Sequence, residues 1–133
     1  MLRSAGNGVL FFLGIIFFDQ VTKWVAVEQG FATVNTGISF GLFSFLPGWI
    51  LLLLVAISTI FLIRLGIRTN QPSWWWGLAV GSASSNVIDR IRVGGVVDWL
   101  PLPLVKVQNN SADWILFFCL FWLFINEYRT IRT

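Results

Sequence analysis

Residues 47–67 have the sequence PGWILLLLVAISTIFLIRLGI, in which Arg64 is the only charged residue. A helix needs about 20 predominantly apolar residues to cross the hydrocarbon core of a bilayer. Pro47 suits the first position of such a helix, where a missing backbone N–H is tolerated. The stretch therefore predicts a membrane-spanning helix from Pro47 to Ile67.

Three further apolar stretches are long enough to span a membrane, at residues 9–27, 74–91 and 112–128. The sequence Gln-Pro-Ser at 71–73 separates the second span from the third. Ser111 can cap the N-terminus of the fourth helix, which puts Asp113 in its first turn. We therefore expect an all-α membrane protein, a four-transmembrane-helix bundle, with residues 1–133 in a single integral membrane domain.

The composition is that of a membrane protein. Of the 133 residues, 56% are hydrophobic and 11% are charged, whereas a soluble domain carries about 25% charged residues. So few charges cannot cover a water-facing surface, which excludes a soluble globular protein and a disordered chain. Most basic residues stand at the ends of the spans, where they anchor and orient the helices, so we expect no nucleic-acid partner.

The side chains available for chemistry are few. The chain has no histidine, which excludes Ser-His and Cys-His nucleophile pairs and metal sites built on histidine. The single cysteine, Cys119, excludes an internal disulfide and a cysteine metal cluster and is expected to be a buried apolar filler. We expect no metal and no cofactor. Acid–base chemistry is left to six carboxylates: Asp19, Glu28, Asp89, Asp98, Asp113 and Glu127.

The distribution of charge predicts the orientation of the bundle. With four spans both termini lie on one side, and five arginines belong to that side: Arg3, Arg64, Arg68, Arg129 and Arg132. Four basic residues belong to the other side: Lys23, Arg90, Arg92 and Lys106. Five of the six acids also lie on that second side, so we place the termini in the cytoplasm and the acidic end outside. Tryptophans then form an outer belt (Trp24, Trp49, Trp99, Trp114) and an inner one (Trp74, Trp75, Trp76).

Polar residues gather at the predicted outer ends of the first two spans. Asp19 and Lys23 are four residues apart on one helix face, so the first expectation is an ion pair that neutralises both, although Asp19 could also line a site. Between these spans lies Asn-Thr-Gly-Ile-Ser-Phe-Gly at 35–41. Gly37 and Gly41 allow tight turns there, and Asn35 can both donate and accept hydrogen bonds.

The third span ends in small and polar residues. The small residues at 81–85 are expected to let helices pack closely. Asn86 and Arg90 share a helix face, whereas Asp89 and Arg90 are adjacent and do not. We expect Arg90 to order backbone groups or a neighbouring carboxylate.

Two carboxylates flank the loop that precedes the fourth span. Asp98 follows Gly-Gly-Val-Val at 94–97, a turn into a short strand, and Asp113 opens the helix. Pro101 and Pro103 prevent a regular helix in the loop, which could fold back and bring the two carboxylates together. Such a pair holds one proton between its members and supplies an acid and a base at once. Spacing alone leaves open whether they are instead solvated loop acids.

Five stretches together resemble lipoprotein signal peptidase (signal peptidase II), a family of four-span aspartic proteases of the bacterial inner membrane. In order, they are Asp-Gln-Val-Thr-Lys at 19–23, residues 35–41, Asn86 to Arg90, Val-Val-Asp at 96–98 and Asn-Ser-Ala-Asp at 110–113. Each is weak alone, but their order and their positions at span ends make the set specific.

The resemblance implies roles for these residues. Asp98 and Asp113 match the catalytic dyad. Polar and charged positions that bind substrate or support the site are matched by Asn35, Gly37, Asn86, Arg90, Asn110, Asp19, Lys23 and Asp89. The implied activity removes the signal peptide of a lipid-modified prolipoprotein before its diacylglyceryl-cysteine, by water attack. The implied partners are these signal peptides and membrane lipids, and the implied form is a monomer with its active site near the outer leaflet.

The chain departs from the family pattern in several places. Ser82 and Ser85 stand where glycines are usual, and Trp99 and Asn109 where phenylalanine is. The segments between Lys23 and Asn35 and between Asp98 and Asp113, which in the family form a small extracytoplasmic β-structure and a flap, are short. We therefore expect a short or divergent member. Two alternatives stay open: a non-catalytic protein that binds lipidated peptides, and a small proton-relay or transport subunit, which is disfavoured because the acids cluster at one end.

Overall fold

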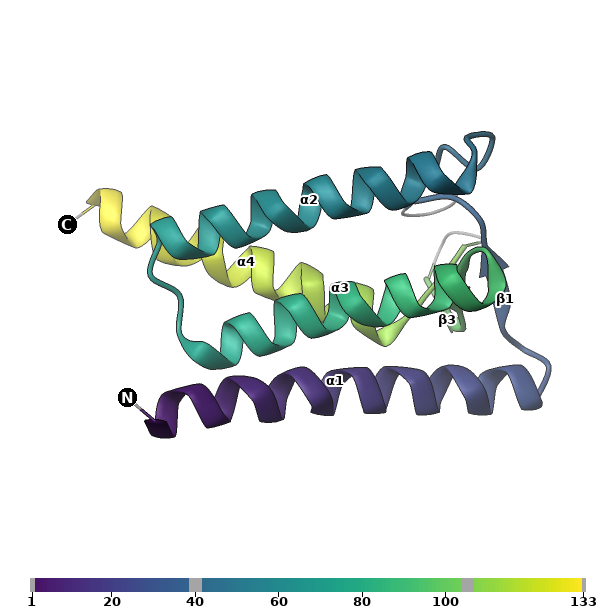
Figure 1. Ribbon diagram of the computed structural model, residues 1–133, viewed down its shortest axis with the longest axis horizontal. Helices are drawn as coiled ribbons and strands as arrows, with labels where there is room; N and C mark the ends of the chain where they lie inside the picture. Colours follow the sequence, from purple (N-terminus) through teal and green to yellow (C-terminus); the bar gives the residue numbers. More distant parts are fainter. Residues whose placement is uncertain (1, 39–41, 104–106, 133) are drawn as a thin grey trace.

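In the described part of the chain, four long helices run side by side along the molecule, and four short strands gather at one end of them (Figure 1). The computed structural model describes residues 2–38, 42–103 and 107–132. The helices are α1 (Leu2–Glu28), α2 (Gly48–Arg68), α3 (Ser73–Val93) and α4 (Ser111–Arg132). Both termini lie at the end opposite the strands (Figure 1). The four predicted stretches are therefore present as helices. Helix α1 begins seven residues before its predicted start, and the other helix ends differ from their predicted positions by one to four residues.

The helix boundaries follow prolines and one asparagine. Pro47 and Pro72 directly precede α2 and α3, so each proline stands at the cap instead of inside the first turn. The predicted cap of α4 is wrong, because Ser111 is already helical. The Asp113 N–H donates to the side-chain oxygen of Asn110, at 3.0 Å. Asn110 can cap this helix because its amide oxygen accepts from the backbone two or three residues on.

Helices α1 and α3 approach closely because glycine faces the partner helix. A Cβ on Gly81 would lie 2.8 Å from the Phe12 carbonyl oxygen and 2.5 Å from a methyl carbon of Ile15. A Cβ on Gly77 would overlap the Gly8 carbonyl oxygen. The packing role predicted for the small residues of the third span is therefore present at Gly81 and extends one turn earlier.

The strands form two antiparallel pairs beyond the helix ends. In the first, β1 (Thr33–Asn35) pairs with β2 (Val96–Asp98), and Thr33 lies opposite Asp98. In the second, β3 (Leu100–Pro101) pairs with β4 (Gln108–Asn109). Gly94 ends α3 in the left-handed conformation, at φ 75°, and turns the chain into β2. The predicted turn into a short strand is confirmed.

The apolar core of the bundle lies at the end away from the strands. Its fully buried centre combines Trp75 and Ala79 with Cys119. The Trp75 ring N–H donates to the Cys119 carbonyl oxygen at 2.9 Å. Cys119 is therefore the buried filler that was expected. The prediction of Trp75 as an interfacial belt residue is wrong, because the helix turns this ring inward and its one polar atom finds a partner there.

Among the described residues, two helices have the length and composition of membrane spans, Gly6–Glu28 within α1 and Gly48–Arg68, which is α2. Within each of them, only 22% and 17% of an apolar stretch of 18 residues is buried inside the molecule. The core helix of a soluble protein would instead bury most of its apolar residues. The exposed apolar surface of α1 and α2 thus matches a lipid surrounding.

Candidate active site

Asn110 holds the two candidate catalytic carboxylates together. It is fully buried where β4 meets α4. Its amide nitrogen donates to Asp98 Oδ1 at 2.6 Å and lies 3.2 Å from Asp113 Oδ2. Because one nitrogen atom contacts both carboxylates, the loop between β2 and α4 folds back and brings Asp98 and Asp113 to the same place. This is the closure that the sequence could only suggest.

Asp98 is buried at the end of β2, and both of its carboxylate oxygens accept hydrogen bonds. The strand pairing brings the Asn35 side chain from β1, and its amide nitrogen donates to Asp98 Oδ2 at 3.0 Å. The Asn35 side-chain oxygen accepts from the Gly37 N–H at 2.9 Å, which fixes the direction of the amide. Burial raises the pKa of Asp98, and the hydrogen bonds from Asn110 and Asn35 oppose that shift.

Asp113 lies in the first turn of α4 and faces α3. The Asn86 amide nitrogen donates to its Oδ1 at 2.6 Å. The Asn86 side-chain oxygen in turn accepts from the Lys23 ammonium at 3.0 Å. Each carboxylate of the pair thus has an asparagine of its own, Asn35 or Asn86, in addition to the shared Asn110.

A buried ionic cluster lies behind the pair. The Lys23 ammonium is 2.6 Å from Asp19 Oδ2 and 2.7 Å from Asp89 Oδ2, and all three side chains are almost completely inaccessible. The expected Asp19–Lys23 ion pair is present, with Asp89 as a second partner. It is buried between α1 and α3 and not at a solvated interface.

The two acids of this cluster bind the backbone beside the candidate dyad. Asp89 Oδ2 accepts from the Val97 N–H at 3.2 Å, one residue before Asp98. Asp19 Oδ1 accepts from the Ala112 N–H at 2.8 Å, one residue before Asp113. The cluster therefore fixes the segments that carry both carboxylates.

Arg90 orders the loop after β1. Its guanidinium donates to the Gly37 carbonyl oxygen at 2.9 Å and to the Asn86 carbonyl oxygen at 3.4 Å. This matches the expectation that Arg90 orders backbone groups. Gly37 lies in a bend, but its φ is not positive. Residues 39–41 of the same motif, with Gly41, and Lys106 lie outside the described residues.

Sequence reasoning missed two side chains of the cluster, Ser85 and Gln20. Ser85, expected only to aid packing, donates to Asp19 Oδ2 at 2.7 Å. The Gln20 amide nitrogen donates to Asp89 Oδ1 at 2.8 Å and to Ser85 Oγ at 3.0 Å. The available signal was spacing: Ser85 is one helical turn before Asp89, so both face α1.

A cavity of about 810 Å³ opens from the candidate site between α2, α3 and α4. One end carries the polar side chains Asn35, Asn86, Arg90 and Asp113. The rest is mostly apolar, with walls from α2 and α4 that include Leu62, Leu65, Leu116 and Phe117. The volume is that of a ligand site, and its polarity suits a largely apolar ligand with one polar group at the carboxylates.

The arrangement is suited to acid–base chemistry on a bound water. Two carboxylates held close together oppose each other's ionisation, and such a pair can hold one proton between its members. Such a pair can take a proton from water and give one to a carbonyl oxygen. Within the described parts of the chain, no three side chains of His, Cys, Asp or Glu gather as a metal site.

Comparison with known families identifies the relatives of this chain. The family model described as "Signal peptidase (SPase) II" matches residues 11–129. The chain belongs to the signal peptidase II family. This membership makes it a hydrolase of the peptidase class, with a role in lipoprotein processing.

Relatives and solved structures agree with this assignment. The lipoprotein signal peptidase of Parasynechococcus marenigrum is 35% identical over 119 residues, covering 74% of each chain. That of Helicobacter pylori (strain ATCC 700392 / 26695) is 32% identical over 117 residues, covering 75% of this chain and 74% of the relative. A bacterial membrane enzyme solved at 2.3 Å has a TM-score of 0.78 at 21% identity, covering 93% of this chain and 88% of its own. Another, solved at 1.9 Å, has a TM-score of 0.70 at 22% identity, covering 90% of each. The structural likeness shows a shared fold.

Proposed function

We propose that this protein is an aspartic endopeptidase that removes signal peptides from lipid-modified prolipoproteins, cleaving before the diacylglyceryl-cysteine. Family membership supports the reaction class and the substrate. The observation that carries the catalytic assignment is the contact of the single Asn110 amide nitrogen with both Asp98 and Asp113.

Hydrolysis by this pair needs no covalent enzyme intermediate. The ionised carboxylate takes a proton from the bound water while the water oxygen forms a bond to the scissile carbonyl carbon. The protonated carboxyl gives its proton to the carbonyl oxygen, which produces a neutral tetrahedral diol. The pair then transfers a proton to the leaving nitrogen and recovers one from the diol, and the C–N bond breaks. Asn35, Asn86 and Asn110 keep both carboxyl groups aligned through these exchanges.

The cavity between α2, α3 and α4 is the proposed substrate groove. Its apolar walls suit the hydrophobic segment of a signal peptide or an acyl chain, and its polar end brings the scissile peptide to the dyad. Arg90 and Gly37, joined by a hydrogen bond at the polar end, are proposed to position the substrate backbone.

We also propose that all four helices span the bacterial inner membrane as one domain, with both termini in the cytoplasm and the strand-bearing end at the outer leaflet. Helices α3 and α4, with 21 and 22 residues, are about 31–33 Å long, close to the roughly 30 Å of the hydrocarbon core. The polar residues of the site lie at one end of the bundle, where a helix leaves the hydrocarbon.

A cleavage assay tests the activity. Purified protein in detergent is mixed with a diacylglyceryl-modified prolipoprotein, and the product is followed by its shift on a gel. The parent protein is expected to release the signal peptide, whereas Asp98→Asn and Asp113→Asn, each folded and inserted, release none. A folded parent that binds the substrate but yields no product would refute the peptidase and favour the non-catalytic binding protein.

A further inference from the structure

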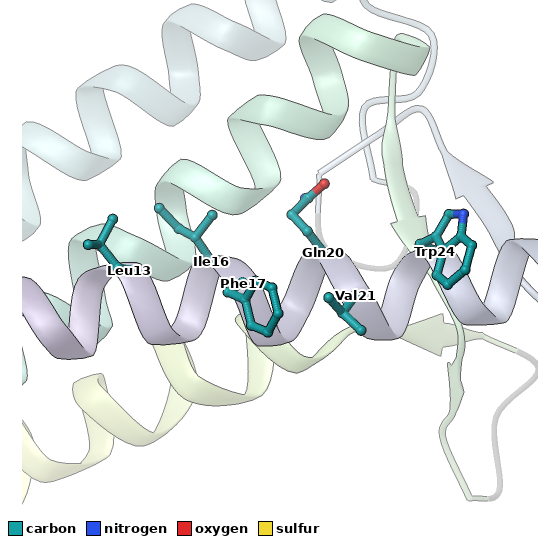
Figure 2. A pocket seen from close by; sticks show the side chains of 6 residues that line it. All are labelled: Leu13, Ile16, Phe17, Gln20, Val21 and Trp24. Atoms are coloured by element: carbon teal, nitrogen blue, oxygen red, sulfur yellow. The ribbon is translucent and has the colours of Figure 1, made fainter.

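A shallow hollow of about 540 Å³ lies on the outside of α1, which contributes no residue to the cavity at the dyad. Six side chains from three turns of this helix line it (Figure 2): Leu13, Ile16, Phe17, Gln20, Val21 and Trp24. Five of them are apolar or aromatic. Phe17 and Trp24 are 72% and 62% exposed, so nothing in the chain covers this part of the helix among the described residues.

The surface of the hollow is almost entirely apolar, and its one polar residue, Gln20, connects to an arginine. In Figure 2 the Gln20 side chain reaches from α1 toward α3. Its amide oxygen accepts from the Arg92 guanidinium at 3.0 Å. Arg90, two residues earlier, lines the cavity at the dyad. Residues two positions apart on a helix point about 200° apart, so Arg92 points away from the catalytic side. Its contact with Gln20 places it beside the hollow.

The Arg92 side chain brings a positive charge that no carboxylate of the described residues neutralises. The nearby acids Asp19 and Asp89 pair with Lys23. Arg92 is exposed, and its partner Gln20 is a neutral amide. The exposed carboxylate of α1, Glu28, lies eight residues beyond Gln20, about 12 Å along the helix. The exposed charge beside the hollow at Gln20 is therefore that of Arg92, whereas the Asp89 carboxylate that also contacts Gln20 is buried and paired with Lys23.

We propose that the hollow binds an anionic phospholipid, with the headgroup phosphate on Arg92 and one acyl chain along Val21, Phe17 and Leu13. From Trp24 to Leu13 the helix rises about 16 Å, which is close to half of the roughly 30 Å hydrocarbon core, the depth of one leaflet. The lengthwise order also fits, because Arg92 and Trp24 stand at the strand-bearing end and Leu13 lies toward the middle of α1. This proposal rests on the four-span arrangement and not on the peptidase activity.

Photo-crosslinking in nanodiscs tests the site without any cleavage assay. The probes are phosphatidylglycerol and phosphatidylcholine with identical acyl chains, each carrying a diazirine, and the labelled peptide is located by mass spectrometry. We expect phosphatidylglycerol to label residues 13–24 about fivefold more than phosphatidylcholine, the factor expected when one surface arginine meets an anionic lipid. Equal labelling by the two probes would overturn the proposal.

Three variants assign the preference to Arg92. Arg92→Gln is expected to label equally with both probes, whereas Arg92→Lys keeps the charge and the preference. Arg68→Gln removes an exposed arginine at the other end of the bundle and is expected to leave labelling of residues 13–24 unchanged. If Arg92→Gln, folded by its thermal transition, keeps the fivefold preference, the headgroup site is not at Arg92 and the proposal fails.

Discussion

Asn110 has several functions in the site. Its side-chain oxygen caps α4 through the Asp113 N–H, and its nitrogen contacts both Asp98 and Asp113. The same amide thus starts the helix that carries one carboxylate and fixes the distance to the other. A serine at this position could cap the helix, but one hydroxyl proton cannot be donated to two carboxylates at once.

Asn35 should control the protonation of Asp98. Its hydrogen bond favours the ionised carboxylate, so Asn35→Leu is expected to raise the pKa of Asp98 further. If Asp98 acts as the base, the acidic limb of the pH–rate profile moves to higher pH. If Asp98 acts as the acid, the alkaline limb moves in that same direction. The profile of kcat/KM for the cleavage reaction measures the shift.

The direction of the shift makes the test decisive. Movement of either limb to lower pH would contradict the role given to the Asn35 hydrogen bond. Ser58→Ala is a matched control, because Ser58 lines the same cavity but bonds to a backbone carbonyl of its own helix. The two limbs of its profile are expected at the same pH as in the parent, whatever the height of the profile.

The elements that carry the site are joined by the Lys23 cluster. Lys23 and Asp19 belong to α1 and Asp89 to α3, and the two acids bind the backbone at β2 and at the start of α4. Four segments that are distant in sequence therefore converge on one ammonium group. This cluster compensates for the shortness of β1 and β2, which have three residues each and cannot by themselves hold the site rigid.

Removing the Lys23 charge should destabilise the whole bundle. Lys23→Met leaves two buried carboxylates without their cation, which is expected to cost about 3–5 kcal/mol. The measurement is thermal unfolding in detergent, followed by tryptophan fluorescence. The exposed Arg68→Met serves as control and should change stability by less than about 0.5 kcal/mol. A Lys23→Met protein as stable as the parent would show that the cluster contributes nothing to the fold.

Hydropathy and residue type predicted where the helices and turns lie, but they did not predict which distant side chains contact one another. Helix positions follow from local apolar runs, and the turn at Gly94 follows from glycine. The hydrogen bond from Ser85 to Asp19 and the burial of Trp75 depend on partners 66 and 44 residues away, which no local pattern contains. The approach of Asp98 to Asp113 was predicted only in part. The loop prolines excluded a helix between the two residues, but they did not determine that the loop folds back and brings the two carboxylates together.

Over the whole molecule, polar chemistry and apolar packing are separated along the helix axes. The dyad, its asparagines and the Lys23 cluster lie toward the strands, whereas the core of Leu62, Trp75 and Cys119 lies toward the termini. A transmembrane proton relay would need polar groups through the full length. This distribution favours a site at one membrane surface, with the proposed substrate groove between α2, α3 and α4 opening from it.

The most direct test of the account is a double-mutant cycle on the dyad. If Asp98 and Asp113 act on one water, as proposed, each single Asn variant should lower kcat about 10⁴-fold or more, and the double variant should fall no further. Cleavage of a diacylglyceryl-modified prolipoprotein, with the product identified by mass spectrometry, gives the three rates. If either single variant keeps activity within about tenfold of the parent, or if the two losses multiply in the double variant, the two carboxylates do not form one catalytic unit.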